Sequence, residues 1–321
     1  MRVILVIFLL AGVPASVAAQ APFESVGSRA LGMAGAFVGV ADDVTAAWWN
    51  PAGMATGPIG SATVEWSRFQ KRDPSGPVIP GGDRGGSSFT GIGSWPVAVS
   101  FGRVTTTEIV EGPGLRTSAR SLSASQYAVT VLQTVVHGLV IGSTLKYVRG
   151  TAASGPVPDA TVEAALDAVD ALGSRTSGAF DLDLGLMADL DRVRLGVTWK
   201  NLRSPDFETL EGTAITLPRQ ARFGLAVLPT DGLTLAMDID LDTVDLRGGL
   251  RRMIAFGAET VLGPRAALRG GVRWNLEGAR RPVTAVGASL ALRPQFWLDG
   301  YYSYGPSEVD RGFGIALRAG T

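Results

Sequence analysis

The sequence contains no cysteine, only one histidine and no excess of charge, because 29 basic residues balance 29 acidic residues in a chain of 321. Without cysteine, the protein can form no disulfide framework, thiolate metal site or cysteine nucleophile. The zero net charge argues against nucleic-acid binding, which needs a basic stripe to offset the phosphate charge. Nucleic acid is therefore excluded from the expected partners.

Catalytic and metal-binding motifs are also missing. The single histidine, His137, lies in a predicted turn and has no second ligand or orienting partner, so it supports neither a metal site nor a catalytic triad. Asp238, Asp240 and Asp242 begin like an EF-hand loop, but Thr243 stands where that loop requires glycine, which leaves weak calcium binding as a minor alternative. We expect no enzyme activity, no catalytic residue, no cofactor and no metal.

The sequence also lacks a long apolar run. Residues 1–19 have the pattern of a secretory signal peptide, with Arg2 before the apolar run Val3–Leu10, then Pro14, and a cleavage site after Ala19. No later stretch reaches the roughly 18 apolar residues of a membrane-spanning helix. We therefore expect an exported chain that is either a β-barrel or a soluble fold.

From Ile59 onward, apolar residues alternate with polar or small residues, which is the period of β-strands. In the run 180–186, for example, Phe180, Leu182, Leu184 and Leu186 share one face, whereas Asp181 and Asp183 share the other. A soluble sandwich would bury the apolar face, and an outer-membrane barrel would turn it toward lipid. The alternation alone does not separate these two interpretations.

The lengths of the connections favour the barrel. We predict fourteen strands, at 59–69, 88–94, 96–105, 122–134, 139–150, 177–189, 192–202, 220–228, 233–241, 252–262, 266–275, 283–292, 295–304 and 311–319. Long segments follow the first, third, fifth and seventh strands, and tight turns follow the even-numbered ones. Short turns at one rim and long loops at the other are typical of outer-membrane barrels. The predicted fold is all-β, a 14-stranded antiparallel transmembrane barrel formed by residues 58–321.

Aromatic residues stand near the predicted strand ends, where a barrel has girdles at the membrane surfaces, although the edges of a sandwich would also accept them. They are Trp66, Tyr127, Tyr147, Trp199, Trp274, Tyr302 and Tyr304. One long loop carries a predicted helix over 159–172, with Asp159 as its N-cap and Val162, Leu166 and Val169 on its apolar stripe. This helix is either a lid that packs on the rim or one wall of a hydrophobic capture groove.

The stretch Gly27–Met54 is rich in glycine and alanine and has no clean strand or helix period. It contains GSRALGMAGA, the acidic pair Asp42-Asp43 and the sequence WWNPAGM. These three features resemble the N-terminus of the FadL superfamily of outer-membrane transporters for long-chain fatty acids and aromatic hydrocarbons. They are also similar to the shorter PorV/PorQ-type relatives associated with protein secretion. The resemblance implies fourteen strands and an N-terminal hatch inside the lumen, which we assign to residues 20–57.

Glycines of the predicted inward faces fit such a hatch, because they make room for a second chain against the wall. They are Gly185, Gly196, Gly224, Gly257, Gly271, Gly287 and Gly314, and in the hatch itself Gly32, Gly35 and Gly39. Asp42 and Asp43 would be costly inside the lumen unless paired or hydrogen-bonded, and the lumenal Arg and Lys residues of the wall are their candidate partners. With Arg29 we expect them to anchor the hatch.

The resemblance also implies a role in ligand binding and gating for the corner Asn50-Pro51-Ala52, with Trp48, Trp49 and Phe37 beside it. A plug latch with a purely structural role is the alternative for this corner. The chain is shorter than typical fatty acid transporters, so its outer loops are reduced. This puts an elaborate capture site in doubt and favours the shorter relatives.

The predicted function is passive uptake of hydrophobic small molecules, long-chain fatty acids or hydrocarbons, across the cell outer membrane by a monomer. Its expected partners are membrane lipids and the hydrophobic substrate. In the main alternative, the barrel does not transport but acts as a PorV-like scaffold or shuttle, with proteins of a secretion system as partners. A third alternative is an exported soluble β-rich protein.

Overall fold

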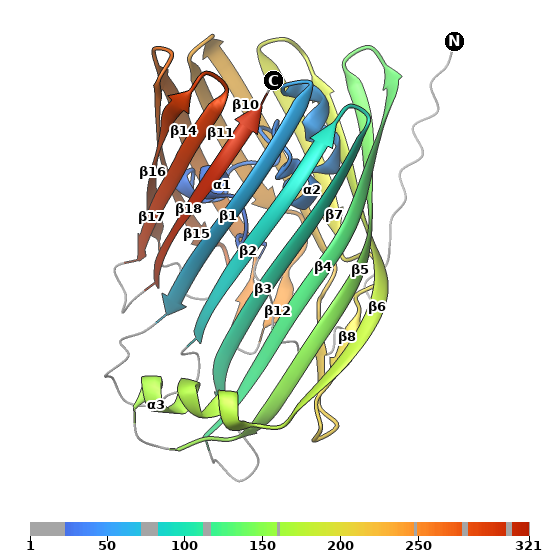
Figure 1. Ribbon diagram of the computed structural model, residues 1–321, viewed down its shortest axis with the longest axis vertical. Helices are drawn as coiled ribbons and strands as arrows, with labels where there is room; N and C mark the ends of the chain where they lie inside the picture. The colour runs from blue at the N-terminus through green and yellow to red at the C-terminus, as the bar shows by residue number, and fades with distance from the viewer. Residues whose placement is uncertain are drawn as a thin grey trace.

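The structure is a computed structural model that describes residues 23–71, 83–111, 117–158, 161–246, 249–277, 282–305 and 310–320. Within these ranges the chain forms a closed antiparallel barrel of 14 strands, as the alternation and the loop lengths predicted (Figure 1). The predicted signal peptide, residues 1–19, lies outside the described residues. In the part of the chain that the structure describes, no helix is long and apolar enough to cross a membrane.

Strands that follow one another along the wall pair with each other, and β1 closes the barrel on β18. The wall strands are β1 (Gly60–Lys71), β2 (Asp83–Ser94), β3 (Val97–Glu111), β4 (Thr117–Val136), β5 (Leu139–Pro156), β6 (Ser174–Asp189), β7 (Val193–Lys200), β10 (Gln220–Thr230), β11 (Leu233–Asp240), β14 (Met253–Leu262), β15 (Ala266–Asn275), β16 (Val283–Arg293), β17 (Phe296–Gly305) and β18 (Asp310–Gly320).

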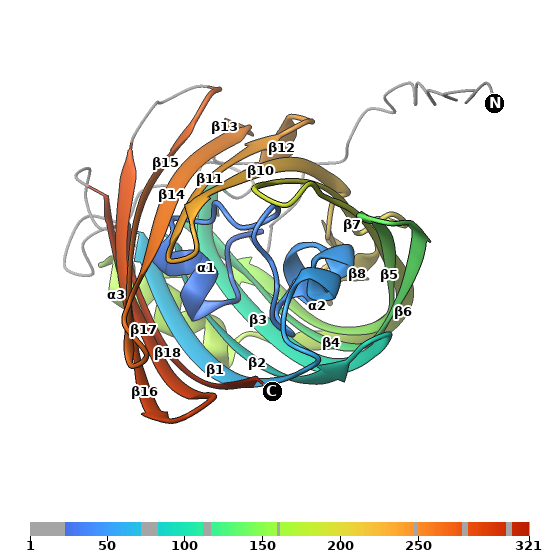
Figure 2. The same ribbon diagram turned by 90° about the horizontal axis from the view of Figure 1, so that it is seen from above.

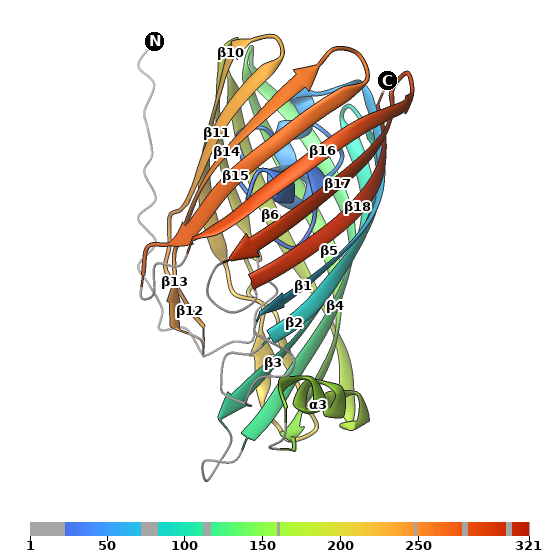
Figure 3. The same cartoon turned by 90° about the vertical axis from the view of Figure 1, so that its left-hand side faces the viewer.

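Each of the fourteen predicted strands coincides with a wall strand, but several strands are longer than predicted. β3 continues to Glu111 and β5 to Pro156, whereas the alternation predicted ends at 105 and 150. The extension of β3 reads TTEIVE, with its two apolar residues adjacent, and that of β5 reads TAASGP, with only small residues and proline. Neither has the apolar alternation that marks a strand. Figure 3 shows β3 and β4 reaching well below the ends of β16–β18.

Outward and inward faces of the wall differ sharply in chemistry. On β5, Leu145 faces outward with 57% of its surface exposed, whereas its neighbour Lys146 faces inward and is 1% exposed. Outward aromatic rings pair across strands, with ring centroids 5.1 Å apart for Phe101–Tyr127 and 5.3 Å apart for Tyr147–Phe180. An apolar exposed belt edged by aromatic rings suits contact with lipid and not with water.

Residues 23–57 lie inside the barrel, in the half where β1 begins and β18 ends (Figures 1 and 2). They form three short helices, α1 (Ser28–Gly32), α2 (Ala46–Trp49) and η1 (Pro51–Thr56). α1 contacts β15–β18, and η1 contacts β4–β6 on the opposite side of the lumen. The segment therefore crosses the lumen from wall to wall, and we call it the hatch.

The long loops at the opposite end carry further elements. The predicted loop helix is present as α3 (Val162–Asp167) continued by η3 (Ala168–Ala171). Its cap is Thr161, whose hydroxyl accepts a hydrogen bond from the Ala164 N–H, and the predicted cap Asp159 lies outside the described residues. Two unpredicted hairpins are β8 (Asp206–Glu208) with β9 (Ala214–Thr216), and β12 (Val244–Leu246) with β13 (Gly249–Arg251).

Candidate functional site: the hatch and its contacts in the lumen

Close backbone contacts seat the hatch against the wall. A methyl group at Gly32 would lie 3.1 Å from Gly287 Cα of β16, and one at Gly39 would lie 3.0 Å from the backbone nitrogen of Ala226 in β10. A methyl group at Gly257 of β14 would lie 2.7 Å from the Met33 oxygen. Carbon atoms rarely approach so closely, so these contacts require glycine, as the sequence predicted.

Two of the predicted glycines have other neighbours. A methyl group at Gly35 would meet Glu24 Cγ at 2.8 Å, within the hatch, and the backbone of Gly35 has a φ of +87° that favours glycine. A methyl group at Gly314 would meet Ser67 Cβ at 2.8 Å, within the wall. The prediction that both allow hatch and wall to approach is therefore wrong for this pair.

The corner Asn50-Pro51-Ala52 joins the hatch to β6. Asn50 is completely buried, and its Nδ2 donates to the Val38 oxygen of the hatch and to the Leu186 oxygen of β6, both at 3.0 Å. Its Oδ1 accepts from the Ala52 N–H at 3.2 Å. Asn50 is extended, with φ −151° and ψ 102°, as expected for a residue before proline. One side chain thus makes three hydrogen bonds that fix the corner.

Two wall glycines accommodate this corner. A methyl group at Gly185 of β6 would lie 2.9 Å from Pro51 Cδ and 3.0 Å from the Ala52 nitrogen, and one at Gly142 of β5 would lie 2.8 Å from Ala52 Cα. Any larger residue at these positions would displace the corner from the wall.

Buried aromatic rings form the core of the hatch. Trp49 packs against Phe23 and Phe37, with centroid distances of 5.2 and 5.9 Å, and its Nε1 donates to the Val26 oxygen at 2.9 Å. Trp48 donates through Nε1 to the Phe23 oxygen at 2.9 Å. All three predicted aromatic residues, Trp48, Trp49 and Phe37, are therefore brought together, in a packed core with satisfied indole donors.

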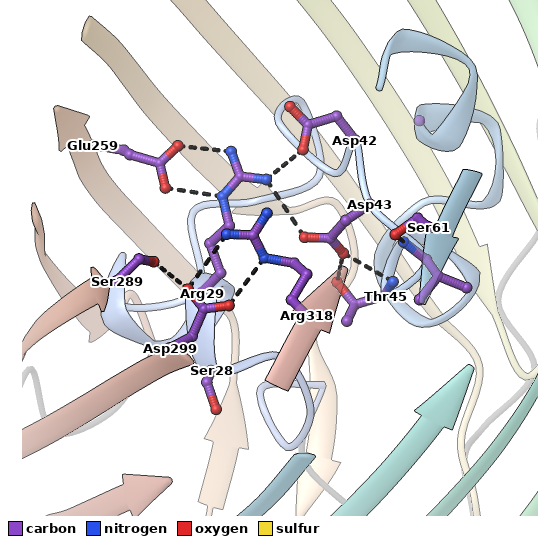
Figure 4. A network of polar contacts seen from close by, with 12 residues as sticks. Ser28, Arg29, Asp42, Asp43, Thr45, Ser61, Glu259, Ser289, Asp299 and Arg318 are labelled. Carbon is purple, nitrogen blue, oxygen red and sulfur yellow. Dashed lines mark hydrogen bonds and ion pairs between the residues drawn. The ribbon is translucent and has the colours of Figure 1, made fainter. Parts of the chain in front are cut away.

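Arg29 links two parts of the hatch to each other and the hatch to the wall (Figure 4). Its guanidinium forms ion pairs with Asp42, with Asp43 at 3.4 Å and with Glu259 of β14 at 2.6 Å. Arg194 of β7 approaches Asp42 more distantly, at 3.8 Å. Burial lowers the pKa of Arg29, but the nearby charges of Asp42 and Glu259 raise it by more, so the pKa lies well above its ordinary value. The acidic pair thus finds its main cation within the hatch, not among the lumenal cations that the sequence suggested.

The ionic network continues along the wall. Arg269 pairs with Glu259 and reaches Asp299 of β17 at 3.5 Å. Arg318 of β18 donates to Asp299 at 2.9 Å (Figure 4). A connected set of this kind compensates the cost of burying charge, because each carboxylate faces at least one guanidinium.

A second cluster surrounds Glu24. Arg222 of β10 donates to its Oε1 at 2.5 Å, and Arg251 of β13 pairs with its other oxygen. Burial raises the pKa of Glu24, but Arg251 and Arg222 lower it by more, and the pKa lies well below its ordinary value. The Arg222 guanidinium also lies 4.2 Å from the Phe23 ring centroid. This cluster ties the start of the hatch to the wall.

Two wall carboxylates, Glu65 and Asp238, bind backbone amides of the hatch, a role that the sequence did not predict for either. Glu65 of β1 accepts from the N–H groups of Gly27 and Ser28, at 2.5 and 2.9 Å. Asp238 of β11 accepts from those of Phe37 and Val38, at 3.0 and 2.9 Å. Their inward position was visible in the strand period, but their partners depend on how the hatch is folded.

The β8–β9 hairpin folds against β5 and β6 on the inner side of the wall. Phe207, completely buried, packs over Gly150 on the inward face of β5, in an apolar cluster with Leu122, Val148 and Leu217. A cavity of about 10 Å³ lies between the hatch, the wall and Leu217, which follows the hairpin, and it has room for about one water molecule.

This cavity is lined in part by Phe23, Trp48 and Lys200. The Lys200 Nζ lies 3.6 Å from the Trp48 ring centroid and 4.6 Å from that of Phe23, within the range of a cation–π contact. The hatch and Leu217, the residue after the hairpin, thus lie on opposite sides of one small cavity.

The predicted capture-groove residues lie on α3 and η3, far from the hatch. Val162 and Leu166 are buried against Ile109 of β3, and Val169 is 4% exposed. Arg84 of β2 donates to the Leu166 oxygen at 3.0 Å, at the end of the helix. The apolar stripe is thus packed on the wall, and a capture role would require the helix to lift away.

Several solved structures have the same fold. The CymD monoaromatic hydrocarbon channel superposes with a TM-score of 0.65 at 14% identity, covering 92% of this chain and 98% of that one. The Pseudomonas putida toluene transporter TodX gives 0.63 at 12% identity, covering 94% and 99%. A Pseudomonas aeruginosa FadL homologue gives 0.60 at 12% identity, covering 92% and 98%.

The family model described as "F plasmid transfer operon, TraF, protein" matches residues 110–240, which is less than half of the chain. No curated protein matches the sequence. Over almost its whole length, the chain therefore has the fold of the FadL-type hydrocarbon channels, as the resemblance of its N-terminal stretch predicted.

Proposed function

We propose that the protein is an outer-membrane channel through which hydrophobic small molecules, long-chain fatty acids or hydrocarbons, enter passively. The observation that carries this proposal is a hatch seated in a 14-stranded barrel whose fold matches channels described for toluene and monoaromatic hydrocarbons. The exposed apolar belt supports a place in the membrane, because a closed barrel satisfies its backbone in lipid. A monomer is sufficient, since the barrel closes on itself.

Passage through this channel requires movement, because the hatch fills one half of the lumen and Phe207 closes part of the other. The corner Asn50-Pro51-Ala52 is the proposed gate. It is held by three hydrogen bonds from a single side chain, each with a net contribution of about 1 kcal/mol. Loss of those bonds would favour an open corner without disturbing the strand ladders.

The test compares uptake of radiolabelled toluene and of a long-chain fatty acid by cells with wild-type protein, with none, and with Asn50→Ala/Pro51→Ala, at equal surface levels. Wild-type uptake should exceed that of cells without the protein, and the double variant should take up more. Thr56→Ala is the control, because its hydroxyl makes one local bond to the Gly53 oxygen. Equal uptake with and without wild-type protein would overturn the transport function. Equal uptake by variant and wild type would overturn only the gating role.

A second candidate function is a PorV-like scaffold or shuttle for a secretion system. The closure of the lumen from two sides, by the hatch and by the β8–β9 hairpin, favours it. A scaffold would co-purify with secretion components from detergent-solubilised membranes and would give no uptake in the assay above. Uptake without any such partner supports the channel instead.

A further inference from the structure

An apolar groove of about 540 Å³ lies on the outside of the barrel, across β1–β3 and beside the ends of β17 and β18. Large outward side chains form its rim: Val64, Ile92, Val99, Phe101, Phe296 and Leu317. Val64 and Ile92 are 58% and 62% exposed, so the groove is open to the surroundings of the barrel. The small side chains of Ala62 and Thr90 keep its floor low. The groove is thus a depression within the lipid-facing belt.

The outer end of the groove leads to two arginines. Phe101 and Val64 both pair with Thr90, and the next outward row across the same strands is Trp66, Ser88 and Arg103. Arg103 is exposed, and its Nε donates to Ser125 Oγ at 3.0 Å. The cation therefore stands two residues beyond the rim of the groove, where the face of β3 changes from apolar to polar.

Arg68 stands on the other side of the same row. Its guanidinium lies 5.2 Å from the Trp66 ring centroid, and the side chain is exposed. Arg68 pairs with Gly86, and Ser88 pairs with Arg103, so only the small residues of β2 separate the two arginines. Strand spacing places their Cα atoms about 12 Å apart, within reach of one shared phosphate. Among the described residues, no carboxylate forms an ion pair with either arginine.

The height of Arg68 fits a lipid headgroup. It lies eight positions after Gly60, the first residue of β1. A strand tilted by about 40° rises roughly 2.6 Å per residue along the barrel axis, so this separation is about 21 Å, close to the roughly 25 Å apolar band of such barrels. The arginines therefore stand at one edge of the belt, and the groove descends from them into it.

We infer that this face binds one anionic, phosphate-bearing lipid, with its phosphate between Arg68 and Arg103 and an acyl chain in the groove. The groove is continuous with the lipid-facing wall, which favours an acyl chain over a protein partner. The two arginines at its end supply the charge that a phosphate requires, and arginine binds phosphate oxygens in a bidentate manner. The aromatic ring of Trp66 suits the interface between chain and headgroup. The site is independent of the lumen and of transport.

The test uses the full chain, purified in a mild detergent, and native mass spectrometry with added phosphatidylglycerol or phosphatidylcholine. The wild type should retain phosphatidylglycerol in preference to phosphatidylcholine. Arg68→Ala/Arg103→Ala should weaken phosphatidylglycerol binding about 30-fold, because the variant loses two basic side chains that attract the anionic headgroup. Arg68→Lys/Arg103→Lys, which keeps the charge, should retain most of the binding. Thr90→Phe should fill the groove and lower the retention of both lipids.

The control removes the same charge elsewhere, with Arg149→Ala/Arg265→Ala, because both side chains are exposed and neither adjoins the groove. Equal losses in control and test would mean a general charge effect and overturn the site. Wild-type binding in Arg68→Ala/Arg103→Ala would also overturn it. If Thr90→Phe keeps phosphatidylglycerol but lowers uptake of toluene, the groove serves the transported compound instead. Barrel folding of each variant is checked by its heat-dependent migration on a gel.

Discussion

Replacement of Arg29 by methionine tests whether the ionic network holds the hatch. The change replaces the aliphatic part of the side chain by one of similar shape but removes the cation that faces Asp42, Asp43 and Glu259. Removing one partner of a buried ion pair costs about 3–5 kcal/mol. The lower end applies here, because Arg269 still pairs with Glu259. We therefore expect the hatch to be destabilised by about 3 kcal/mol, which corresponds to about 10²-fold more frequent opening.

Hydrogen–deuterium exchange, resolved by peptide, measures this opening. Amides of the hatch should exchange about 10²-fold faster in Arg29→Met, whereas those of the wall keep their rates, because the strand ladders do not depend on Arg29. Arg192→Met is the matched control, since Arg192 pairs with Asp231 at 2.8 Å at the surface, with side chains 55% and 94% exposed. Such exposed pairs contribute at most about 1 kcal/mol, so its hatch should exchange at the wild-type rate.

One result would refute the reasoning: hatch amides in Arg29→Met that exchange as slowly as in the wild type. The aromatic core of Phe37 and Trp49 would then hold the hatch without the network. The double variant Arg29→Met/Glu259→Gln separates charge from packing. It should recover part of the lost protection, because it removes one of the carboxylates left without its partner.

Two further predictions concern the hatch. Gly185→Val should displace the corner 50–52 and speed the exchange of its amides. Gly270→Ala is the control and should leave exchange unchanged, because its methyl group would lie 3.8 Å from its nearest neighbour. Faster exchange in Gly270→Ala than in Gly185→Val would contradict the fit of hatch and wall. Because the folded pKa of Glu24 lies below its ordinary value of 4.5, its pairing with Arg222 is fully present above that pH and is lost as the pH falls through the folded pKa. Exchange at the start of the hatch, corrected for its intrinsic pH dependence, should therefore stay constant from pH 7 to pH 5 and rise only below about 4.5; a rise already above pH 5 would contradict this.

Short-range patterns in the sequence predict much of the architecture. The alternation of Phe180–Leu186 fixes which residues face outward on β6, because successive side chains of a strand point to opposite sides. The turns at Asp191 and Gly263 lie where predicted, and both residues have positive φ. Glycines such as Gly185 and Gly257 marked where a second chain approaches the wall. These features depend on neighbours within a few residues, so they can be read without the fold.

Only the tertiary structure determines which residues of the hatch and the wall contact each other. Arg29 meets Glu259, 230 positions away, and Asn50 meets Leu186, 136 positions away, because closure of the barrel and the register of its strands bring them together. The sequence does not predict the β8–β9 hairpin, because its strands are three residues long and are stabilised by Phe207 packing on Gly150 rather than by their own pattern. Local periodicity determines which way a side chain points. Only the assembled barrel determines what it meets there.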